Sequence, residues 1–319
     1  MVKILKDHPA DSTSIRDAYV AQLVEEAKKN PRIVAIDCDL SSSMGTKPFV
    51  KALPNQHFNV GIAEANGLNM AAGMADAGLI PFFHTFSCFA SRRVYDQIFL
   101  SIYGGLKIHV MGGDAGLTTA GNGGTHMTFA DIGMMRMMPE MIVMEASDSV
   151  MMKSLTKQLP YTDCSTYVRM PRKPLTAIYE EGSEFEIGKA VVLREGKDVS
   201  IITYGILVAE ALKAADMLAA EGIEATVVDM FTIKPLDTDC LIRCAKSTGA
   251  VVVAENHNMN GGLMEGVAGV LAENCPVPME RVANMDHFGE VGNIPYLLEK
   301  LELTADVIAA KAKKAISRK

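Results

Sequence analysis

The sequence contains no tryptophan, and aromatic residues make up only 6% of its 319 residues. It also lacks any run approaching the roughly 20 apolar residues that a membrane-spanning helix needs. The opening stretch, "MVKILKDHPADSTS", has no apolar core of the kind found in secretory signals. We therefore expect the protein to stay in the cytoplasm.

Paired cysteines and an excess of basic charge are missing as well. The six cysteines are scattered without CxxC spacing, which indicates neither a zinc site nor a disulfide framework. No metal ligand is predicted on this chain. The net charge of -7 argues against a general affinity for nucleic acid. What is abundant is hydrophobic residues, at 49%, enough for a sizeable core in about two or three domains.

Helix-like and strand-like segments alternate through the first half of the chain. The stretch "SIRDAYVAQLVEEAKKN" repeats its apolar residues at helical spacing, and "SRRVYDQIFLSIYG" is also helix-like. Between such segments lie short apolar strands: "RIVAID", "LIPFF", "LKIHVMG", "MIVMEA" and "STYVRMP". This alternation predicts a parallel sheet covered by helices on both faces.

The same rhythm restarts after an irregular segment. Between about residues 172 and 197 the alternation is lost, and the segment reads as a linker with short strand pieces. Strands "VSIITYG", "EATVVDM" and "AVVVAEN" then alternate with helices, and a last helix begins near Thr304. We predict an α/β protein with two doubly wound, mostly parallel sheet domains at 1–180 and 198–319, joined by a linker region at 181–197.

One carboxylate, Glu64, lies inside an otherwise apolar and small-residue stretch, "FNVGIAEANGLNMAAG". A glutamate is seldom fully buried unless it is paired, and burial without a cation raises its pKa by favouring the neutral form. Glu64 is therefore a candidate proton-handling acid. The structural alternative is a place in the first turn of a helix starting near Ala65, where the helix dipole favours an acid. This stretch alone leaves both interpretations open.

A glycine-rich loop, "GDAGLTTAGNGGTHMT", follows a predicted strand and contains His126. It has no Walker or dinucleotide pattern. Because ligands bind at the carboxyl ends of strands in open α/β sheets, the loop nevertheless predicts a ligand site. A surface imidazole is the alternative for His126. Phe86 and Phe89, three residues apart behind a strand, would either sandwich a flat heterocycle or belong to the core.

The order of these motifs resembles the transketolase family. The acid in "GIAEANG", the aromatics in "TFSCF" and the loop ending in "GTH" are similar to its pyrimidine-binding domain, expected at 1–180. The later "VDMFTIKPLD", "GGLMEGV" and "FGEVG" are similar to its C-terminal domain, so the resemblance covers essentially the whole chain. It implies a transferase of carbohydrate metabolism, in the pentose phosphate pathway, that moves a two-carbon ketol unit from a ketose phosphate to an aldose phosphate.

The resemblance also implies thiamine diphosphate as cofactor. Glu64 matches the family's acid on N1′ of the aminopyrimidine ring, where a shared proton favours the imino tautomer that removes the thiazolium C2 proton. Phe86 and Phe89 match the aromatic positions that hold the ring. Arg92 stands where the family often has a further aromatic. His126 matches the substrate-side histidine, so Glu64 and His126 are the expected catalytic residues.

Three further positions match residues that contact the substrate phosphate: Arg16 in "SIRDA", Ser43 in "DLSSSM" and Arg169 in "YVRMP". Arginine suits this task because its planar fork donates two hydrogen bonds at once. The alternatives are a surface residue for Arg16 and a salt-bridged one for Arg169. The loop departs from the family, since Asn122 replaces an aspartate that contacts the acceptor sugar. A histidine that the family often has at the start of the loop is also missing, so the resemblance does not specify which sugar binds.

The family's "GDG…N" motif, which binds the diphosphate and its divalent metal, is absent from this sequence. The resemblance therefore implies a split enzyme. This chain would be the C-terminal subunit, and a separate N-terminal subunit would hold the diphosphate together with Mg²⁺ or Ca²⁺. Two such pairs are expected to form a heterotetramer that is active only when both subunits are present.

Other functions remain open at this point. A beta subunit of a 2-oxo acid dehydrogenase has a similar length and domain plan but lacks the "GTH" ending. A deoxyxylulose-phosphate-synthase-like enzyme shares "GIAE" and "YDQ". From a different class, a non-catalytic regulatory subunit would keep the fold and lose turnover, because a fold alone does not establish a function.

Overall fold

The first of two sheets contains seven strands, of which six run parallel. We describe a computed structural model covering residues 2–319. In spatial order the strands are β10 (Thr232–Lys234), β5 (Met141–Glu145), β6 (Ser165–Met170), β4 (His109–Gly113), β3 (Ile80–Phe86), β1 (Ile33–Asp37) and β2 (His57–Asn59). All pairs are parallel except the one between β10 and β5. The buried, β-branched and apolar composition of these strands suits a sheet covered on both faces.

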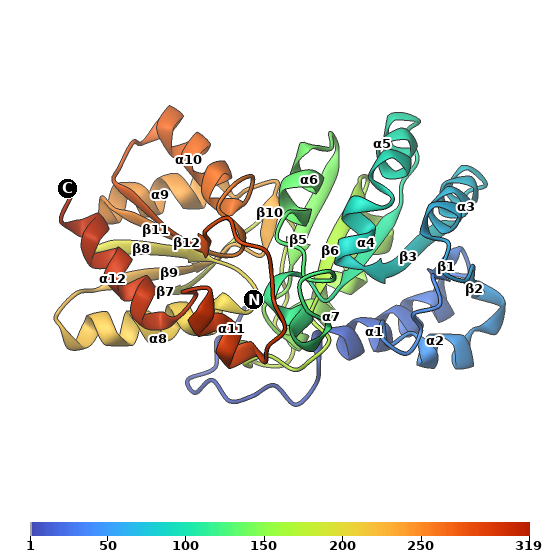
Figure 1. Ribbon diagram of the computed structural model, residues 1–319, viewed down its shortest axis with the longest axis horizontal. Helices are drawn as coiled ribbons and strands as arrows, with labels where there is room; N and C mark the ends of the chain where they lie inside the picture. Colours follow the sequence, from blue (N-terminus) through green and yellow to red (C-terminus); the bar gives the residue numbers. More distant parts are fainter. Residues whose placement is uncertain (1) are drawn as a thin grey trace.

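Helices cover both faces of this sheet, as the right half of Figure 1 shows. One layer consists of α1 (Ile15–Lys29), α2 (Lys47–Ala52) and α7 (Ser149–Gln158), followed by the short η1 (Pro54–Gln56) and η3 (Leu159–Tyr161). The other consists of α3 (Glu64–Asp76), α4 (Ser87–Arg92), α5 (Tyr95–Tyr103) and α6 (Asp131–Met137). The glycine-rich loop contains a short 3₁₀ segment, η2 (Gly116–Asn122).

The second sheet has five strands and lies in the left half of Figure 1. In spatial order they are β12 (Met279–Asn284), β11 (Val251–Asn258), β8 (Val199–Thr203), β9 (Ala225–Asp229) and β7 (Val191–Arg194), with only β7 antiparallel to its neighbour. Its helices are α8 (Leu207–Ala220), α9 (Thr238–Thr248), α10 (Leu263–Asn274), α11 (Ile294–Lys300) and α12 (Ala305–Ile316). The predicted fold class, two mostly parallel α/β sheets, is confirmed.

The structure differs from the sequence-based expectation in three places. Strand β10 leaves the second half of the chain and pairs with β5, so it completes the first sheet. Strand β7 lies in the expected linker but pairs with β9. The helix expected over "SRRVYDQIFLSIYG" is broken between α4 and α5, at Arg93 and the buried Val94. Within residues 2–319, no helix has the length and apolar character required to cross a membrane.

Candidate active site

Glu64 is buried, as the sequence predicts, but it is not alone. It is the first residue of α3 and only 3% of it is exposed. The Nη1 atom of Arg93 donates to its Oε1 at 2.6 Å. The premise of a buried acid without a cation is therefore wrong, because the break between α4 and α5 brings Arg93 to it. The position at a helix N-terminus also favours the carboxylate, so the structural and functional interpretations describe the same residue.

Arg93 also covers an aromatic face. Its guanidinium carbon lies 4.0 Å from the centroid of the Phe89 ring. The Arg93 side chain is 46% exposed, whereas that of Glu64 is 3% exposed. A planar cation thus makes two contacts at once: a hydrogen bond to a buried acid and a stack on a phenylalanine. Arg93 was not singled out from the sequence, whereas its neighbour Arg92 was.

The two phenylalanines and the histidine of the glycine-rich loop come together. The centroids of Phe86 and Phe89 are 6.0 Å apart. The His126 ring approaches both edge-on, at 5.9 Å from Phe86 and 5.4 Å from Phe89. These separations fall within the range for interacting aromatic rings. The fold therefore assembles three predicted site residues that the sequence separates by 40 positions at most.

Arg92 and Asn122 lie on the rim of this cluster. The Arg92 side chain is exposed and its Nη2 donates to the carbonyl oxygen of Thr125 at 2.9 Å. It therefore contacts the loop beside His126, whereas Arg93 covers the ring of Phe89. Asn122 is exposed at the end of η2. The Thr125 hydroxyl lies 2.9 Å from Nδ1 of His126.

Two arginines lie near the carboxyl ends of the central strands. Arg16, at the start of α1, donates through Nη1 to the carbonyl oxygen of Ser43 at 3.0 Å. Arg172, just beyond β6, donates to Asp114 and lies 5.5 Å from the Phe86 ring centroid. Burial raises the pKa of Asp114, while Arg172 and Arg16 oppose this shift. Arg172 was not singled out from the sequence, although it stands in the same "VRMPR" stretch as Arg169.

Arg169 does not face this cluster, which corrects the expectation that it contacts a substrate phosphate. Its side chain is fully buried in β6. It donates to Asp131 through Nε at 2.8 Å and to Glu145 through Nη1 at 2.6 Å. Its Nη2 donates to the carbonyl oxygen of Asn256 in β11, in the second sheet. The salt-bridged alternative is the correct one, and the hydrogen bond to Asn256 links the two domains.

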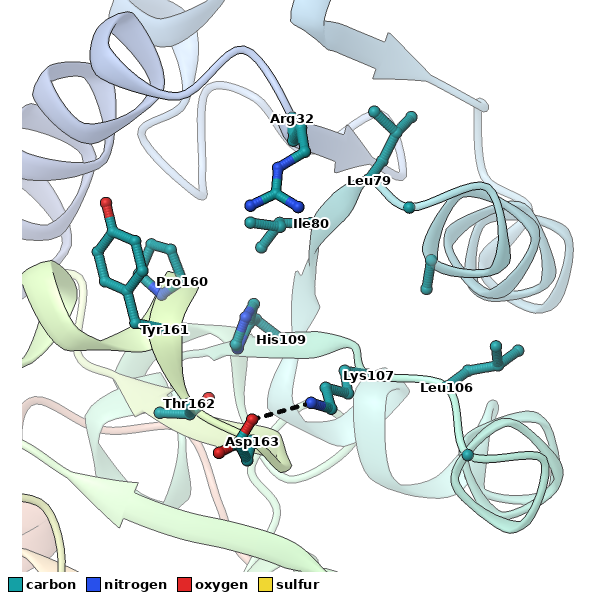
Figure 2. Close-up of a pocket in the computed structure, with 13 residues that line it drawn as sticks. Arg32, Leu79, Ile80, Leu106, Lys107, His109, Pro160, Tyr161, Thr162 and Asp163 are labelled. Atoms are coloured by element: carbon teal, nitrogen blue, oxygen red, sulfur yellow. Dashed lines mark hydrogen bonds and ion pairs between the residues drawn. The ribbon is translucent and has the colours of Figure 1, made fainter.

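A separate cavity of about 390 Å³ opens at the opposite edge of the first sheet (Figure 2). Lys107 pairs there with Asp163 at 3.1 Å, and Arg32 points across the opening. Burial lowers the pKa of His109 to about 3, so its imidazole is neutral. Because α3 and α5 end beside this cavity, the two cations complement the negative ends of helices. The cavity holds none of the predicted site residues.

Comparison with known protein families covers both halves of the chain. Residues 11–177 match the transketolase pyrimidine-binding domain, and residues 188–308 match the transketolase C-terminal domain. The 6-deoxy-6-sulfo-D-fructose transketolase subunit of Clostridium sp. (strain MSTE9) is 47% identical over 306 residues, which span 96% of this chain and 95% of the relative.

Two further relatives bear on the function. A solved structure described as a split-gene transketolase, in an inactive β4 tetramer, superposes with a TM-score of 0.88 at 41% identity, covering 96% of this chain and 99% of that one. The 1-deoxy-D-xylulose-5-phosphate synthase 1 of Geobacter sulfurreducens is 34% identical over 318 residues, which are 98% of this chain and 49% of that enzyme.

Proposed function

This chain belongs to the transketolase family, and we propose that it is the C-terminal subunit of a two-component transketolase, contributing the pyrimidine half of a thiamine-diphosphate site. One observation carries the proposal. Arg93 is a flat cation that hydrogen-bonds the buried Glu64 at 2.6 Å and stacks on Phe89 at 4.0 Å. A flat, nitrogen-containing ring would make the same two contacts.

The residues present fit the aminopyrimidine ring. Glu64 would hold a proton at a ring nitrogen, while Phe86 and Phe89 would contact the ring face. When bound, thiamine diphosphate supplies the electron sink needed to break a carbon–carbon bond beside a ketose carbonyl. Arg93 has to leave both Glu64 and Phe89 for the ring to bind. Its half-exposed side chain gives Arg93 room to move into solvent when the ring takes its place on Glu64 and Phe89.

The sugar is proposed to bind between His126 and the two arginines. His126 would donate a hydrogen bond near the reacting carbons. Arg172 and Arg16 would hold an acidic group at the far end of the ketose, which is a phosphate or a sulfonate. The relative from Clostridium, whose name specifies a sulfonated fructose, supports including sulfonates. Asn122 on the loop would help to select the acceptor.

The rest of the active site is assigned to a partner. The two family domains that match this chain are the pyrimidine-binding and C-terminal domains. We assign the diphosphate and its Mg²⁺ or Ca²⁺ to a separate N-terminal subunit, with two pairs of subunits in a heterotetramer. Activity then requires both chains. The split-gene relative, described as inactive in a β4 tetramer, supports this requirement.

The first test is calorimetric titration of thiamine diphosphate with Mg²⁺ into this chain alone and into its mixture with the N-terminal subunit. Tight binding only in the mixture is expected, because each chain supplies half of the contacts. The mixture should then transfer a ketol unit to an aldose phosphate. Failure to bind the cofactor in either sample would overturn the proposal.

Arg172→Gln tests the acidic anchor. Ketose phosphates and ketose sulfonates should both show a KM raised about 10- to 100-fold, since a hydrogen bond to a charged group is worth about 1.5–3 kcal/mol. Neutral ketoses should be unaffected, which provides the internal control. The synthase relative defines the competing outcome: release of carbon dioxide from pyruvate with glyceraldehyde 3-phosphate would instead indicate deoxyxylulose phosphate synthesis.

A further inference from the structure

We propose that the second domain positions His126, and that Asn256 is the residue through which it does so. The carboxyl end of β11, called here the β11 latch (Asn256, His257 and Asn258), crosses to the first domain and contacts both stems of the loop 114–130. The structure shows these contacts between the latch and the loop. The catalytic consequence rests on the proposed function, in which His126 meets the substrate.

Asn256 binds the first stem of the loop through its side-chain amide. The backbone N–H of Leu117 donates to Asn256 Oδ1 at 2.9 Å, and Asn256 Nδ2 donates to the carbonyl oxygen of Ala115 at 3.3 Å. The side chain is fully buried. It therefore satisfies one donor and one acceptor of an irregular loop that has no strand neighbour there. Losing it would leave the Leu117 N–H buried without an acceptor, whereas the Ala115 carbonyl keeps the Thr118 hydroxyl as a donor.

Gly116, which lies between these two backbone groups, is shaped for the same contact. Its φ of +55° is in the left-handed region, which glycine adopts at little cost. A Cβ atom at this position would collide with Oδ1 of Asn256. The loop and the latch are thus complementary, since the glycine leaves the space that the amide fills.

The other two latch residues hold the second stem and the start of α6, which follows it. The N–H of Asn258 donates to the carbonyl oxygen of Phe129 at 2.9 Å. The N–H of Gly133 donates to Nε2 of His257 at 3.2 Å. Burial lowers the pKa of His257 to about 4, which keeps this nitrogen free to accept. A single strand end therefore fixes both points at which the loop leaves the first domain.

A second segment of the same domain packs against the tip of the loop. A Cβ atom at Gly123 would lie 2.7 Å from Cγ2 of Val291, and one at Gly124 would collide with the carbonyl oxygen of Gly289. Both glycines belong to the turn that ends at His126, whose N–H donates to the carbonyl oxygen of Gly123 at 3.1 Å. The β11 latch holds both stems of the loop, and residues 289–291 pack against its glycines. These contacts keep His126 facing Phe86 and Phe89. Since a misplacement of about 1 Å costs catalytic rate, such a loop needs external support.

Hydrogen exchange on the full chain tests the contact directly. In Asn256→Ala, the Leu117 amide should exchange about tenfold faster or more, because its acceptor is gone. Amides of β8 should keep their protection. The matched control is Asn274→Ala, at the exposed end of α10, which should change neither. Gly116→Ala reaches the same contact from the loop side and should give the same loss of Leu117 protection, so the test survives if Asn256→Ala does not fold.

Kinetics of the chain mixed with the N-terminal subunit test the consequence. Expressed per bound thiamine diphosphate, kcat should fall about tenfold or more in Asn256→Ala, because His126 loses its position while Glu64 and Phe89 keep theirs. Asn256→Asp retains the acceptor for Leu117 and should recover part of the rate. The cofactor KM should not change.

The possible outcomes separate the two claims. If Asn256→Ala left the exchange rate of the Leu117 amide unchanged, the proposal that Asn256 holds the loop would be overturned. A fall in kcat that matches the loss of bound cofactor would also overturn it, because this is the pattern of a merely unfolded fraction. If the wild-type mixture transfers no ketol unit, the proposed function fails instead, and the exchange result still decides whether the latch orders the loop.

Discussion

Two arginine–carboxylate pairs in the first domain use the same chemistry in opposite surroundings. Arg93 binds Glu64 with a side chain that is 46% exposed. Arg169 binds Asp131 and Glu145 with all three side chains essentially inaccessible. Both pairs contain contacts of 2.6 Å, so distance alone does not distinguish them.

Burial of the arginine decides what each pair can do. Arg93 can exchange its carboxylate for solvent and release Glu64 to a ligand. Arg169 has no such alternative, because leaving Asp131 or Glu145 unpaired would strand a charge in the interior. Burial raises the pKa of Glu145 even with Arg169 beside it. The comparison therefore predicts that the first pair governs activity and the second governs stability.

The largest expected effect is on catalysis, at the pair of Arg93 and Glu64. Glu64→Gln keeps the shape and a hydrogen bond but cannot pass a proton, so the rate of ketol transfer by the two-subunit mixture should fall about 100- to 10,000-fold. Stability in urea should stay nearly unchanged. A variant with full activity would identify the chain as a regulatory subunit.

The matching change at the buried pair should act on folding. Arg169→Met should lower the free energy of unfolding by about 3–5 kcal/mol, since it leaves Asp131 and Glu145 uncompensated. Arg194→Met is the control: its pair with Asp216 is exposed at the surface, so the loss should stay below about 1 kcal/mol. Urea denaturation of both variants measures the difference. Equal losses would remove the contrast between the pairs.

The free energy of unfolding should also respond to pH through the buried Asp229. Burial raises the pKa of Asp229 to about 7, and the Tyr179 hydroxyl donates to it at 2.7 Å. Between its ordinary value of 3.8 and about 7, the folded chain holds a proton that the unfolded chain releases. Stability should therefore fall across this range, by up to about 1.4 kcal/mol per pH unit from this group, and level off above it.

Asp229→Asn should remove this contribution to the slope. Glu255, whose pKa burial also raises to about 7, adds the same slope to both proteins, so the difference between them isolates Asp229. The measurement is the free energy of unfolding at a series of pH values from 4 to 8. Identical slopes in the two proteins would show that Asp229 is ionised when folded.

The smallest expected effect is on cofactor affinity. Arg93→Gln removes a cation that competes for the buried Glu64 and for Phe89, and the contact with Phe89 is worth about 0.5–1 kcal/mol at an exposed site. Thiamine diphosphate should then bind the two-subunit mixture about 3- to 10-fold more tightly by calorimetry. Arg32→Gln, at the remote cavity in Figure 2, should leave the affinity unchanged. Weaker binding in Arg93→Gln would mean that Arg93 holds the cofactor.

Local pattern predicted much of this molecule. The sequence predicts a helix ending near Asn30 and another beginning near Thr304, and in the structure these residues are the C-cap of α1 and the N-cap of α12. The burial of Glu64 followed from its apolar neighbours. The phosphate contact expected for Arg169 rested on a short motif match, and such a match does not show that Asp131, Glu145 and the second domain enclose this side chain. Arg172, three residues on, lies beyond the strand and reaches the aromatic cluster instead.

The sequence by itself determined the periodicities of the two sheets, the order of the acid, aromatic and glycine-rich motifs, and therefore the family. These depend on residues close together in the chain. Only the tertiary structure decided that Arg93 pairs with Glu64, that β10 pairs with β5 about 90 residues earlier, and that Asn256 meets the loop of His126. Such contacts join positions well separated in the chain, and the packing of helices, sheets and domains against one another selects them.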